Sequence, residues 1–442
     1  MPFSPALSAE QRPLAFRLLL ALLAAGLLIA AVWPGYLSFD SSFMWWQART
    51  LALSNLQSSG MTLVLAALLR LGASPGLLVA LHIGAFFLLL AWLPSVLGLR
   101  LGWRVLLLAL SPPLLLLLPH LWTDVHLLVV LLAAALFLLA AAQTGSRALR
   151  MLGFVALAYA LLVRPNALAA VLPLACALSL QSFARWPQRL GLIGAVLVVG
   201  FLLGRTLDRV WVVEHRDAWA VLLLWDLQAI GATTGEVELP AGLYYPSLTA
   251  AAFKASFDPD TAMGVFNSPV ANPGAEQFTQ ARKAALLKRW WEAVRAHPEI
   301  YLAHRARTFG RLLGPHRDGT AVHLFDMPGQ VAFRDNPPLA SAWPSAHERF
   351  RALAEMLKSS GLATPWLWLG LGSTLLAIGT WQRRRHLQIR ERTLLLIGAS
   401  ALAYLLPYAL IAPSTEMRYL AWSICGLMLA GLGMLRTPAQ TR

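Results

Sequence analysis

Charged side chains are scarce in this chain of 442 residues, since Asp, Glu, Lys and Arg together make up only 13% of it. Hydrophobic residues make up 58%, and the mean hydropathy is +0.61. A soluble domain needs far more charge on its surface, so the composition excludes that class. It predicts an all-α polytopic membrane protein, because long apolar runs cross lipid as helices.

Acidic residues are the scarcer charge, with 21 Asp and Glu against 36 Lys and Arg and a net charge of +15. The stretch 206–361 is balanced, with 16 basic and 16 acidic side chains, so the excess lies among the apolar runs. Excess Lys and Arg beside apolar runs indicates which side of the membrane each connection faces. We therefore do not expect nucleic acid as a partner. Only five acids fall outside this stretch: Glu10, Asp40, Asp124, Glu391 and Glu416.

Cysteine and the common catalytic motifs are also missing. Cys176 and Cys425 both lie inside apolar runs, so no disulfide framework or CxxC metal site is implied. The chain has no GxGxxG, P-loop, GxSxG or HExxH motif, which counts against nucleotide chemistry and a nucleophile elbow. The N-terminal run 13–33 has no small-residue cleavage site and further apolar runs follow it, so we interpret it as an anchor.

Apolar runs long enough to cross a bilayer recur along the chain, since a spanning helix needs about 20 residues. We expect about ten transmembrane helices, near 13–33, 75–97, 103–118, 125–142, 149–163, 167–182, 190–205, 362–381, 393–411 and 419–435. The apolar run 61–71 is too short to span, and we expect it to lie at the membrane interface.

Basic residues orient these spans. With the N-terminus inside, the inner connections carry most of the arginines, as the positive-inside rule requires: Arg100, Arg104, Arg147, Arg150, Arg185, Arg189, the segment 382–392 and Arg436. The chain then divides into an N-terminal membrane module (1–205) with a first outer loop motif (34–60), a large outer loop (206–361) and a C-terminal membrane module (362–442). We expect a multi-pass protein of the cytoplasmic (inner) membrane.

Three of the scarce acids, Asp40, Asp124 and Glu416, fall in outer connections at the membrane edge. An unpaired carboxylate is costly beside hydrocarbon unless it does chemistry or meets a partner. Arginines at the same edge could clamp a phosphate through their planar fork. We therefore expect a site that faces the periplasm or outside, with Asp40 and Asp124 as catalytic carboxylates. The substrate-binding candidates are Arg164, Asn166, Glu416, Arg418, Gln47 and Trp122.

Each of these groups also has an ordinary structural interpretation. Asp40 and Asp124 could cap helix N-termini, and the segment 414–416 could cap the last span. Arg164 could snorkel to lipid headgroups. Asp40, Asp124 and His120 could in principle bind a divalent metal, but no tight ligand spacing supports this, so we expect no cofactor.

The large outer loop contains amphipathic pieces. Apolar residues recur at helical spacing in 281–296, and 297–315 has Pro298 at a first-turn position before it closes at Gly314. We expect two helices along the membrane rim. The stretches 255–276 and 314–345 are rich in Asn, Asp, Gly and Pro and predict loops.

Together these motifs resemble the GT-C superfamily of integral membrane glycosyltransferases, which includes oligosaccharyltransferases, protein O-mannosyltransferases and the enzyme that adds aminoarabinose to lipid A. The similar features are "SFDSS" with Asp40 in the first outer loop and "LWTDV" with Asp124 at the outer end of the next pair of spans. "LLVRPNAL", "RWWEAVRAHPEIYLAHR" and "STEMRYL" look like bacterial members. The chain departs from members with paired acids in the first loop, because it has Asp40 alone.

The resemblance implies transfer of a sugar from a polyprenyl-phosphate donor to a hydroxyl of a glycan, lipid or protein, with inversion. Asp40 would be the base, Arg164 or Arg418 would stabilise the phosphate leaving group, and Asp124 or Glu416 would stabilise an oxocarbenium-like transition state. Two alternatives stay open: a polysaccharide polymerase or ligase that uses polyprenyl-linked glycans, and a flippase or transporter of lipid-linked sugars. Spans nearly free of ionisable groups disfavour the transporter.

Overall fold

The computed structural model describes residues 11–97, 102–215, 218–240, 243–244, 247–264, 279–314, 322–324, 329–385 and 387–435. Within these ranges regular structure is almost entirely helical. The exception is a parallel pair of short strands, β1 (Leu53–Ser54) and β2 (Val212–Glu214). The fold is therefore all-α, as the composition predicts.

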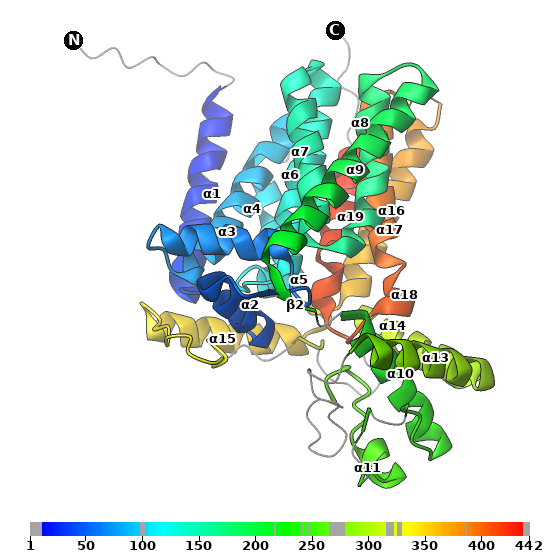
Figure 1. Cartoon of the computed structure of the whole chain (residues 1–442). Helices are drawn as coiled ribbons and strands as arrows, with labels where there is room; N and C mark the ends of the chain where they lie inside the picture. Colours follow the sequence, from blue (N-terminus) through cyan, green and yellow to red (C-terminus); the bar gives the residue numbers. More distant parts are fainter. Residues whose placement is uncertain are drawn as a thin grey trace.

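Seven segments are long and apolar enough to cross a membrane, and they run side by side in one bundle (Figure 1). They are α1 (Gln11–Val32), α4 (Pro75–Leu97), α6 (Thr123–Thr144), η2 with α8 (Pro165–Ala167, Leu168–Ser182), α9 (Trp186–Trp211), α17 with α18 (Ile389–Leu405, Tyr408–Ile411) and η5 with α19 (Met417–Leu420, Ala421–Met434). α9 extends beyond the expected span 190–205 at both ends. The chain thus has the character of a membrane protein.

The other three expected spans differ from these seven. The stretch 103–118 is not one helix but a 3₁₀-helix, η1 (Gly102–Leu110), followed by the short α5 (Pro112–Leu117). Pro112 and Pro113 explain the break, because proline has no N–H to donate and its ring clashes with the preceding turn. α7 (Arg147–Val163) and α16 (Pro365–Arg383) lie in the bundle but are shorter or less apolar. Seven described segments therefore have the length and apolar character of a membrane span, and the other three expected spans do not meet both criteria.

The packing of α16 on α19 depends on glycine. A Cβ atom at Gly372 would lie 2.8 Å from the backbone of Leu427, and one at Gly379 would lie 2.6 Å from the Cβ of Met434. Small residues let two helix backbones approach closely, so that van der Waals contact replaces the hydrophobic driving force that lipid does not provide. α19 is the most enclosed of the seven apolar segments.

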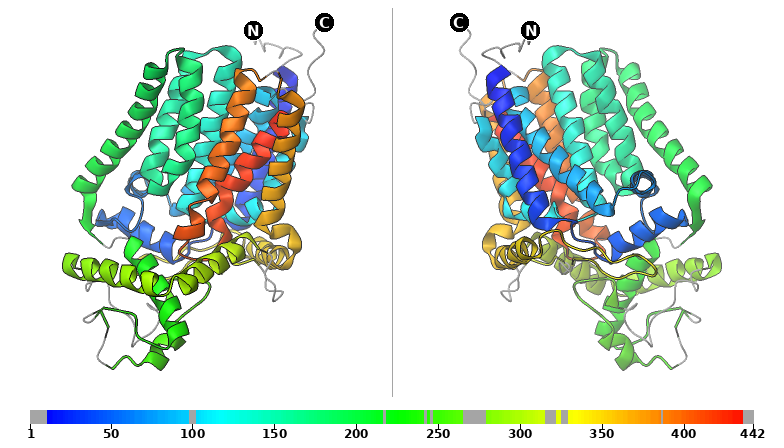
Figure 2. Two further views of the ribbon diagram at one scale, coloured as in Figure 1. Left: turned by 90° about the vertical axis from the view of Figure 1, so that its right-hand side faces the viewer. Right: turned by 90° about the vertical axis from the view of Figure 1, so that its left-hand side faces the viewer.

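Shorter helices cover one end of the bundle, which we call the loop end. α2 (Phe39–Thr50), α3 (Ser59–Arg70) and α15 (Pro344–Ser359) lie across the long helices there (Figures 1 and 2). The run 61–71 is thus a separate short helix, α3. The described chain begins and ends at the opposite end of the bundle.

Most of the stretch between α9 and α16 lies beyond the loop end, and we call residues 212–364 the outer segment. α10 (Ala218–Thr234), α11 (Ala250–Ala255), α13 (Gln280–Ala296) and α14 (Pro298–Leu313) enclose a small core of their own, and η4 (Gly361–Ala363) leads back to the bundle. α13 and α14 occupy the ranges expected from the sequence. The expected loops 255–276 and 314–345 lie partly outside the described residues.

Candidate active site

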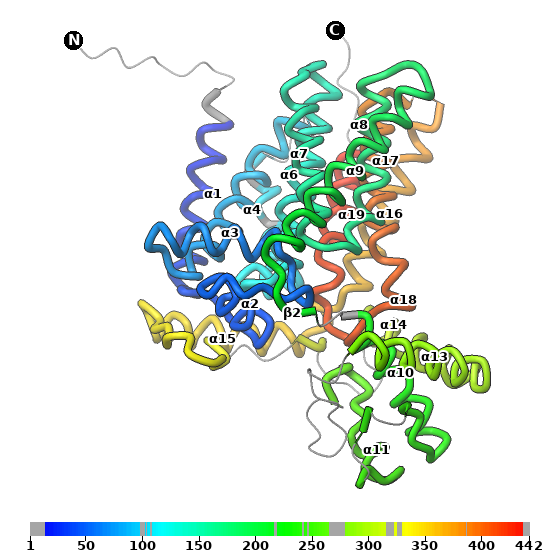
Figure 3. Tube along the Cα trace, viewed as in Figure 1, coloured from blue at the N-terminus to red at the C-terminus, as the bar shows by residue number. Residues whose placement is uncertain are grey.

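Four connections that are far apart in the sequence turn at the loop end (Figure 3). They join α1 to α2, α5 to α6, α7 to α8 and α18 to α19. Side chains on or next to them form two ion pairs, Asp40 with Arg418 and Asp124 with Arg164, which lie 378 and 40 residues apart in the chain. The predicted convergence of these groups on one end of the bundle is therefore observed.

Asp40 lies in the first turn of α2 but does not cap this helix. The N-cap residue is Ser38, whose hydroxyl accepts a hydrogen bond from Trp122 Nε1 at 2.8 Å. Asp40 Oδ2 accepts a hydrogen bond from Arg418 Nη1 at 2.9 Å, while 45% of the Asp40 side chain stays exposed. Among the described residues Oδ1 has no hydrogen-bond partner. One carboxylate oxygen is thus oriented by an arginine, and the other is available to a ligand.

Arg418 is the centre of this cluster. Its Nε lies 2.9 Å from Glu416 Oε2, and its Nη2 donates to the Tyr419 hydroxyl at 3.4 Å. The guanidinium carbon also lies 4.9 Å from the centre of the Trp122 ring, which is a cation–π distance. Only 10% of the Arg418 side chain is exposed and Glu416 is fully buried. Arg418 is therefore committed to protein partners and orients Asp40.

Asp124 and Arg164 form a second ion pair, in which the arginine and not the carboxylate is the more exposed partner. Asp124 lies in the first turn of α6, where free backbone N–H groups favour a carboxylate, and only 4% of its side chain is exposed. Arg164 follows α7 and donates through Nη1 to Asp124 Oδ1, while 22% of its side chain is exposed. No other polar partner of this guanidinium lies among the described residues. Arg164 thus keeps donors for an anion, whereas Asp124 is nearly enclosed.

Tyr419 contacts both Arg418 and Arg164, and Tyr408 and Tyr404 lie next to it; none of these three tyrosines was predicted. Asn166 donates through Nδ2 to the Tyr408 hydroxyl at 2.6 Å, and that hydroxyl donates to Tyr404 at 3.0 Å. The Tyr408 ring stacks on Tyr419, with centroids 5.2 Å apart, and Tyr419 lies 5.7 Å below the Arg164 guanidinium. The motif "STEMRYL" contained a signal for Tyr419. Tyr404 and Tyr408 carried none, because they lie in an apolar run.

Trp122 and His120 form a wall beside Arg418. Their rings stack with centroids 3.8 Å apart, and His120 lies 5.4 Å from the ring of Tyr36. Burial lowers the pKa of His120 to about 3, so the imidazole is neutral at physiological pH. His120 therefore supplies no positive charge to the site. Trp122, which was expected from the sequence to bind substrate, lies between Arg418 and Ser38 and contacts both.

Gln47 is the one predicted site residue that the structure does not bring to the cluster. It lies two turns along α2 from Asp40 and is buried. Its Oε1 accepts a hydrogen bond from the backbone N–H of Ser54 at 2.5 Å. The amide therefore braces the turn between α2 and β1, and the expected contact with substrate has no support in its placement.

The outer segment holds the connection that carries Glu416. The backbone N–H of Thr415 donates to the carbonyl of Asp260 at 2.9 Å. Arg305 of α14, itself buried, donates through Nη1 to the carbonyl of Ala412 at 2.9 Å. These contacts fix the backbone from which Glu416 and its neighbours project. They were not predictable from sequence, because partners more than 100 residues apart meet here.

A second part of the outer segment, residues 329–336, holds α2. The N–H of Val331 donates to the carbonyl of Leu37 at 2.8 Å, and the Ser42 hydroxyl donates to the carbonyl of Val331 at 2.6 Å. Phe333 packs its ring against the aromatic face of α2, 5.2 Å from the centroid of Phe43. The helix that carries Asp40 is thus held in place by residues 329–336.

No three His, Cys, Asp or Glu side chains lie close enough to hold a metal ion within the residues that the structure describes. The three groups considered as ligands have other partners: Asp40 pairs with Arg418, Asp124 pairs with Arg164, and His120 stacks on Trp122. The arrangement suits acid–base chemistry and anion binding, with guanidinium groups as the positive charges.

Comparison of the chain with protein-family models, curated proteins and solved structures finds no match. The function is therefore inferred from the chemistry of these side chains and from their exposure.

Proposed function

We propose that this chain is an inverting membrane glycosyltransferase of the GT-C type, which moves a sugar from a polyprenyl-phosphate donor to an acceptor hydroxyl on a glycan, lipid or protein. One observation carries the proposal: a half-exposed carboxylate, Asp40, and a partly exposed guanidinium, Arg164, belong to one cluster at the loop end. Displacement at an anomeric carbon that bears a phosphate needs a base for the acceptor and a cation for the leaving group.

In the proposed reaction, the acceptor oxygen bonds to the anomeric carbon as the bond from that carbon to the phosphate oxygen breaks. Asp40 takes the acceptor proton through Oδ1, and the polyprenyl phosphate leaves with its negative charge facing Arg164. Attack from the opposite face inverts the anomeric centre. Arg418 is a positioning residue for Asp40, and Asp124 is a positioning residue for Arg164, because both are largely enclosed.

We propose that the chain crosses the inner membrane ten times, with both termini on the cytoplasmic side. η1 and α5 then cross as one broken segment, and α7 and α16 cross as packed members of the bundle. The site opens to the periplasm or outside, where nucleotide sugars are absent and an activated sugar is carried on lipid. The arginines of the inner connections then obey the positive-inside rule.

Reporter fusions test this topology. Fusions after Gly60, after Pro119 and within 230–350 are expected to report the outside, and fusions within 382–391 are expected to report the inside. An outside signal at 382–391 would remove the shared orientation of the site and the outer segment.

Lipid analysis of a strain that lacks this chain tests the activity. We expect a polyprenyl-phosphate sugar to accumulate and one glycan, lipid or protein to lose a sugar, with both effects reversed by the wild-type chain. A strain with unchanged polyprenyl-phosphate lipids contradicts the proposal. Accumulation of a long polyprenyl-linked oligosaccharide instead of a single sugar would favour a polymerase or ligase.

A further inference from the structure

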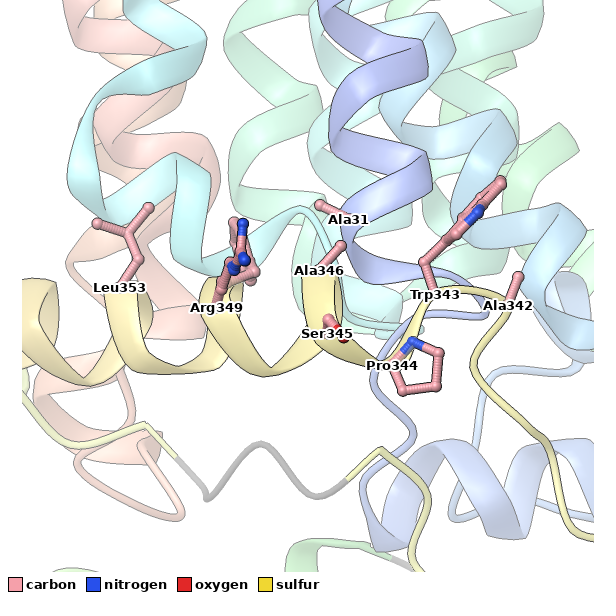
Figure 4. Close-up of a pocket in the computed structure, with 9 residues that line it drawn as sticks. Ala31, Ala342, Trp343, Pro344, Ser345, Ala346, Arg349 and Leu353 are labelled. Carbon is pink, nitrogen blue, oxygen red and sulfur yellow. The ribbon is translucent and has the colours of Figure 1, made fainter.

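A groove lies between α15 and the end of α1 (Figure 4). Its volume is about 620 Å³. The lining consists mostly of apolar side chains with one arginine: Ala31, Ala342, Trp343, Pro344, Ser345, Ala346, Arg349, Phe350 and Leu353. Figure 4 shows Arg349 and Leu353 of α15, and Trp343 just before this helix, extending toward the bundle.

The position of the groove along α1 defines its depth in the bilayer. Ala31 is the last residue but one of the apolar segment Leu14–Val32, so the groove opens where hydrocarbon meets the headgroups. Trp343 is 56% exposed there, and tryptophan favours this level because its ring is amphipathic. The groove is therefore at a depth that lipids of the leaflet reach.

Arg349 sets the charge of the groove. The residue is exposed, and its guanidinium has no acidic partner among the described residues. On the same helix Lys358 is neutralised by Glu355, with an Nζ–Oε1 separation of 2.8 Å. An unpaired cation above apolar walls matches a lipid with an anionic headgroup, since the phosphate meets the guanidinium and the acyl chain meets Ala31 and Leu353.

We propose that this groove binds one anionic glycerophospholipid of the same leaflet as the site, and that this lipid is distinct from the sugar donor. None of the four residues of the two ion pairs at the candidate site lines the groove. A row of rings separates them: Phe350 lies 6.3 Å from Tyr36, Tyr36 lies 5.4 Å from His120, and His120 stacks on Trp122. A phosphate held by Arg349 is therefore kept apart from Asp40.

The bound lipid stabilises α15 against the bundle. Because the Phe350 ring reaches Tyr36, and the row of rings continues to the tryptophan beside Arg418, occupancy also steadies the wall of the site. Binding of this lipid is separate from sugar transfer and does not depend on it.

Native mass spectrometry of the purified full chain in detergent tests the proposal. The probes are phosphatidylglycerol and phosphatidylcholine with identical acyl chains, so that only the headgroup differs. We expect one phosphatidylglycerol per chain to be retained in preference to phosphatidylcholine. Arg349→Ala is expected to weaken phosphatidylglycerol binding about tenfold, which corresponds to about 1.4 kcal/mol.

Arg70→Ala is the matched control, because Arg70 is an exposed arginine at the end of α3 that does not line the groove. Its binding of phosphatidylglycerol should equal that of the wild type, and thermal unfolding should confirm that both variants fold. Equal binding of the two lipids, equal losses in the two variants, or no loss in Arg349→Ala would overturn the proposal. Displacement of phosphatidylglycerol by polyprenyl phosphate at equal concentration would assign the groove to the donor instead. No sugar enters this assay, so its failure leaves the proposed transfer activity untouched.

Discussion

The two ion pairs of the site use the same chemical groups with opposite exposure. In the pair of Asp40 with Arg418, the carboxylate is 45% exposed and the guanidinium 10%. In the pair of Asp124 with Arg164, the carboxylate is 4% exposed and the guanidinium 22%. The first pair thus leaves an oriented carboxylate accessible, and the second leaves an oriented guanidinium accessible.

The difference in exposure between the two ion pairs follows from the position of each residue in the fold. Arg418 begins the most enclosed of the apolar segments and also faces Glu416, so its guanidinium stays inside. Asp124 sits in the first turn of α6, within the bundle, so its carboxylate is the enclosed member. An ion pair with one exposed partner holds that side chain in place and leaves it accessible to a ligand. A fully buried ion pair only holds its two side chains in place.

Arg418→Ala should have the largest effect, because it removes the cation that faces both Asp40 and the buried Glu416. Breaking a buried ion pair by removing one partner costs about 3–5 kcal/mol of stability. We expect lost transfer together with a lower unfolding temperature in detergent. A variant with native transfer would show that Asp40 needs no positioning by Arg418.

Asp40→Asn should abolish transfer and leave the fold intact. The amide cannot take a proton, and losing a general base costs about 10²–10⁴-fold in rate. The pair is half-exposed, so its loss costs about 1 kcal/mol or less. The measurement is transfer in vivo or in detergent, with protein amount followed by immunoblot.

Asp335→Asn is the matched control for Asp40→Asn, since Asp335 forms a more exposed ion pair with Arg49 at the same end, with an N–O distance of 3.2 Å. Transfer by this variant should equal that of the wild type. Near-native transfer by Asp40→Asn would place the base elsewhere, with Asp124 and Glu416 as the remaining carboxylates of the cluster.

Asp124→Asn sharpens the comparison, because it should act on stability more than on chemistry. The neutral amide leaves Arg164 without its counter-charge, at a cost of about 2 kcal/mol for a hydrogen bond to a charged group. Thermal unfolding in detergent measures this loss beside Asp40→Asn. If the two variants exchanged their behaviour, Asp124 would be the base and Asp40 the structural partner.

Arg164→Lys should have the smallest effect of the four substitutions within the two ion pairs. Lysine keeps the charge but loses the planar fork, so one fewer donor is held toward the donor phosphate. We expect the KM for the lipid-linked donor to rise about tenfold, which corresponds to about 1.4 kcal/mol, with little change in kcat. An unchanged KM in both Arg164→Lys and Arg164→Ala would support a purely lipid-facing role for this arginine.

The sequence pattern predicted those helices whose ends are determined by residues nearby in the chain. α13 and α14 begin and end near the expected residues, because helical periodicity and Pro298 are local signals. The expected helix over 103–118 is wrong, since hydropathy counts apolar side chains and does not register that Pro112 and Pro113 break the backbone hydrogen bonds.

The candidate site was predicted in part for the same reason. Only five acidic residues lie outside 206–361, and the expected topology placed three of them, Asp40, Asp124 and Glu416, at one membrane edge. Tyr404 and Tyr408 were missed because an apolar run hides an aromatic hydroxyl. Gln47 was included because it is polar and near Asp40 in sequence, although its amide faces the next turn of the backbone.

The sequence by itself determined that the chain is an apolar helical membrane protein. It also determined which of the scarce charged residues lie at the ends of apolar runs, because hydropathy and charge patterns are properties of short stretches of sequence. Only the tertiary structure decided which carboxylate is open and which is enclosed. Exposure depends on contacts between residues 40 and 378 positions apart, on the backbone contacts of the outer segment, and on how deeply each helix packs. No local pattern contains that information, since an Asp–Arg pair exposes either its carboxylate or its guanidinium according to which partner the surrounding helices cover.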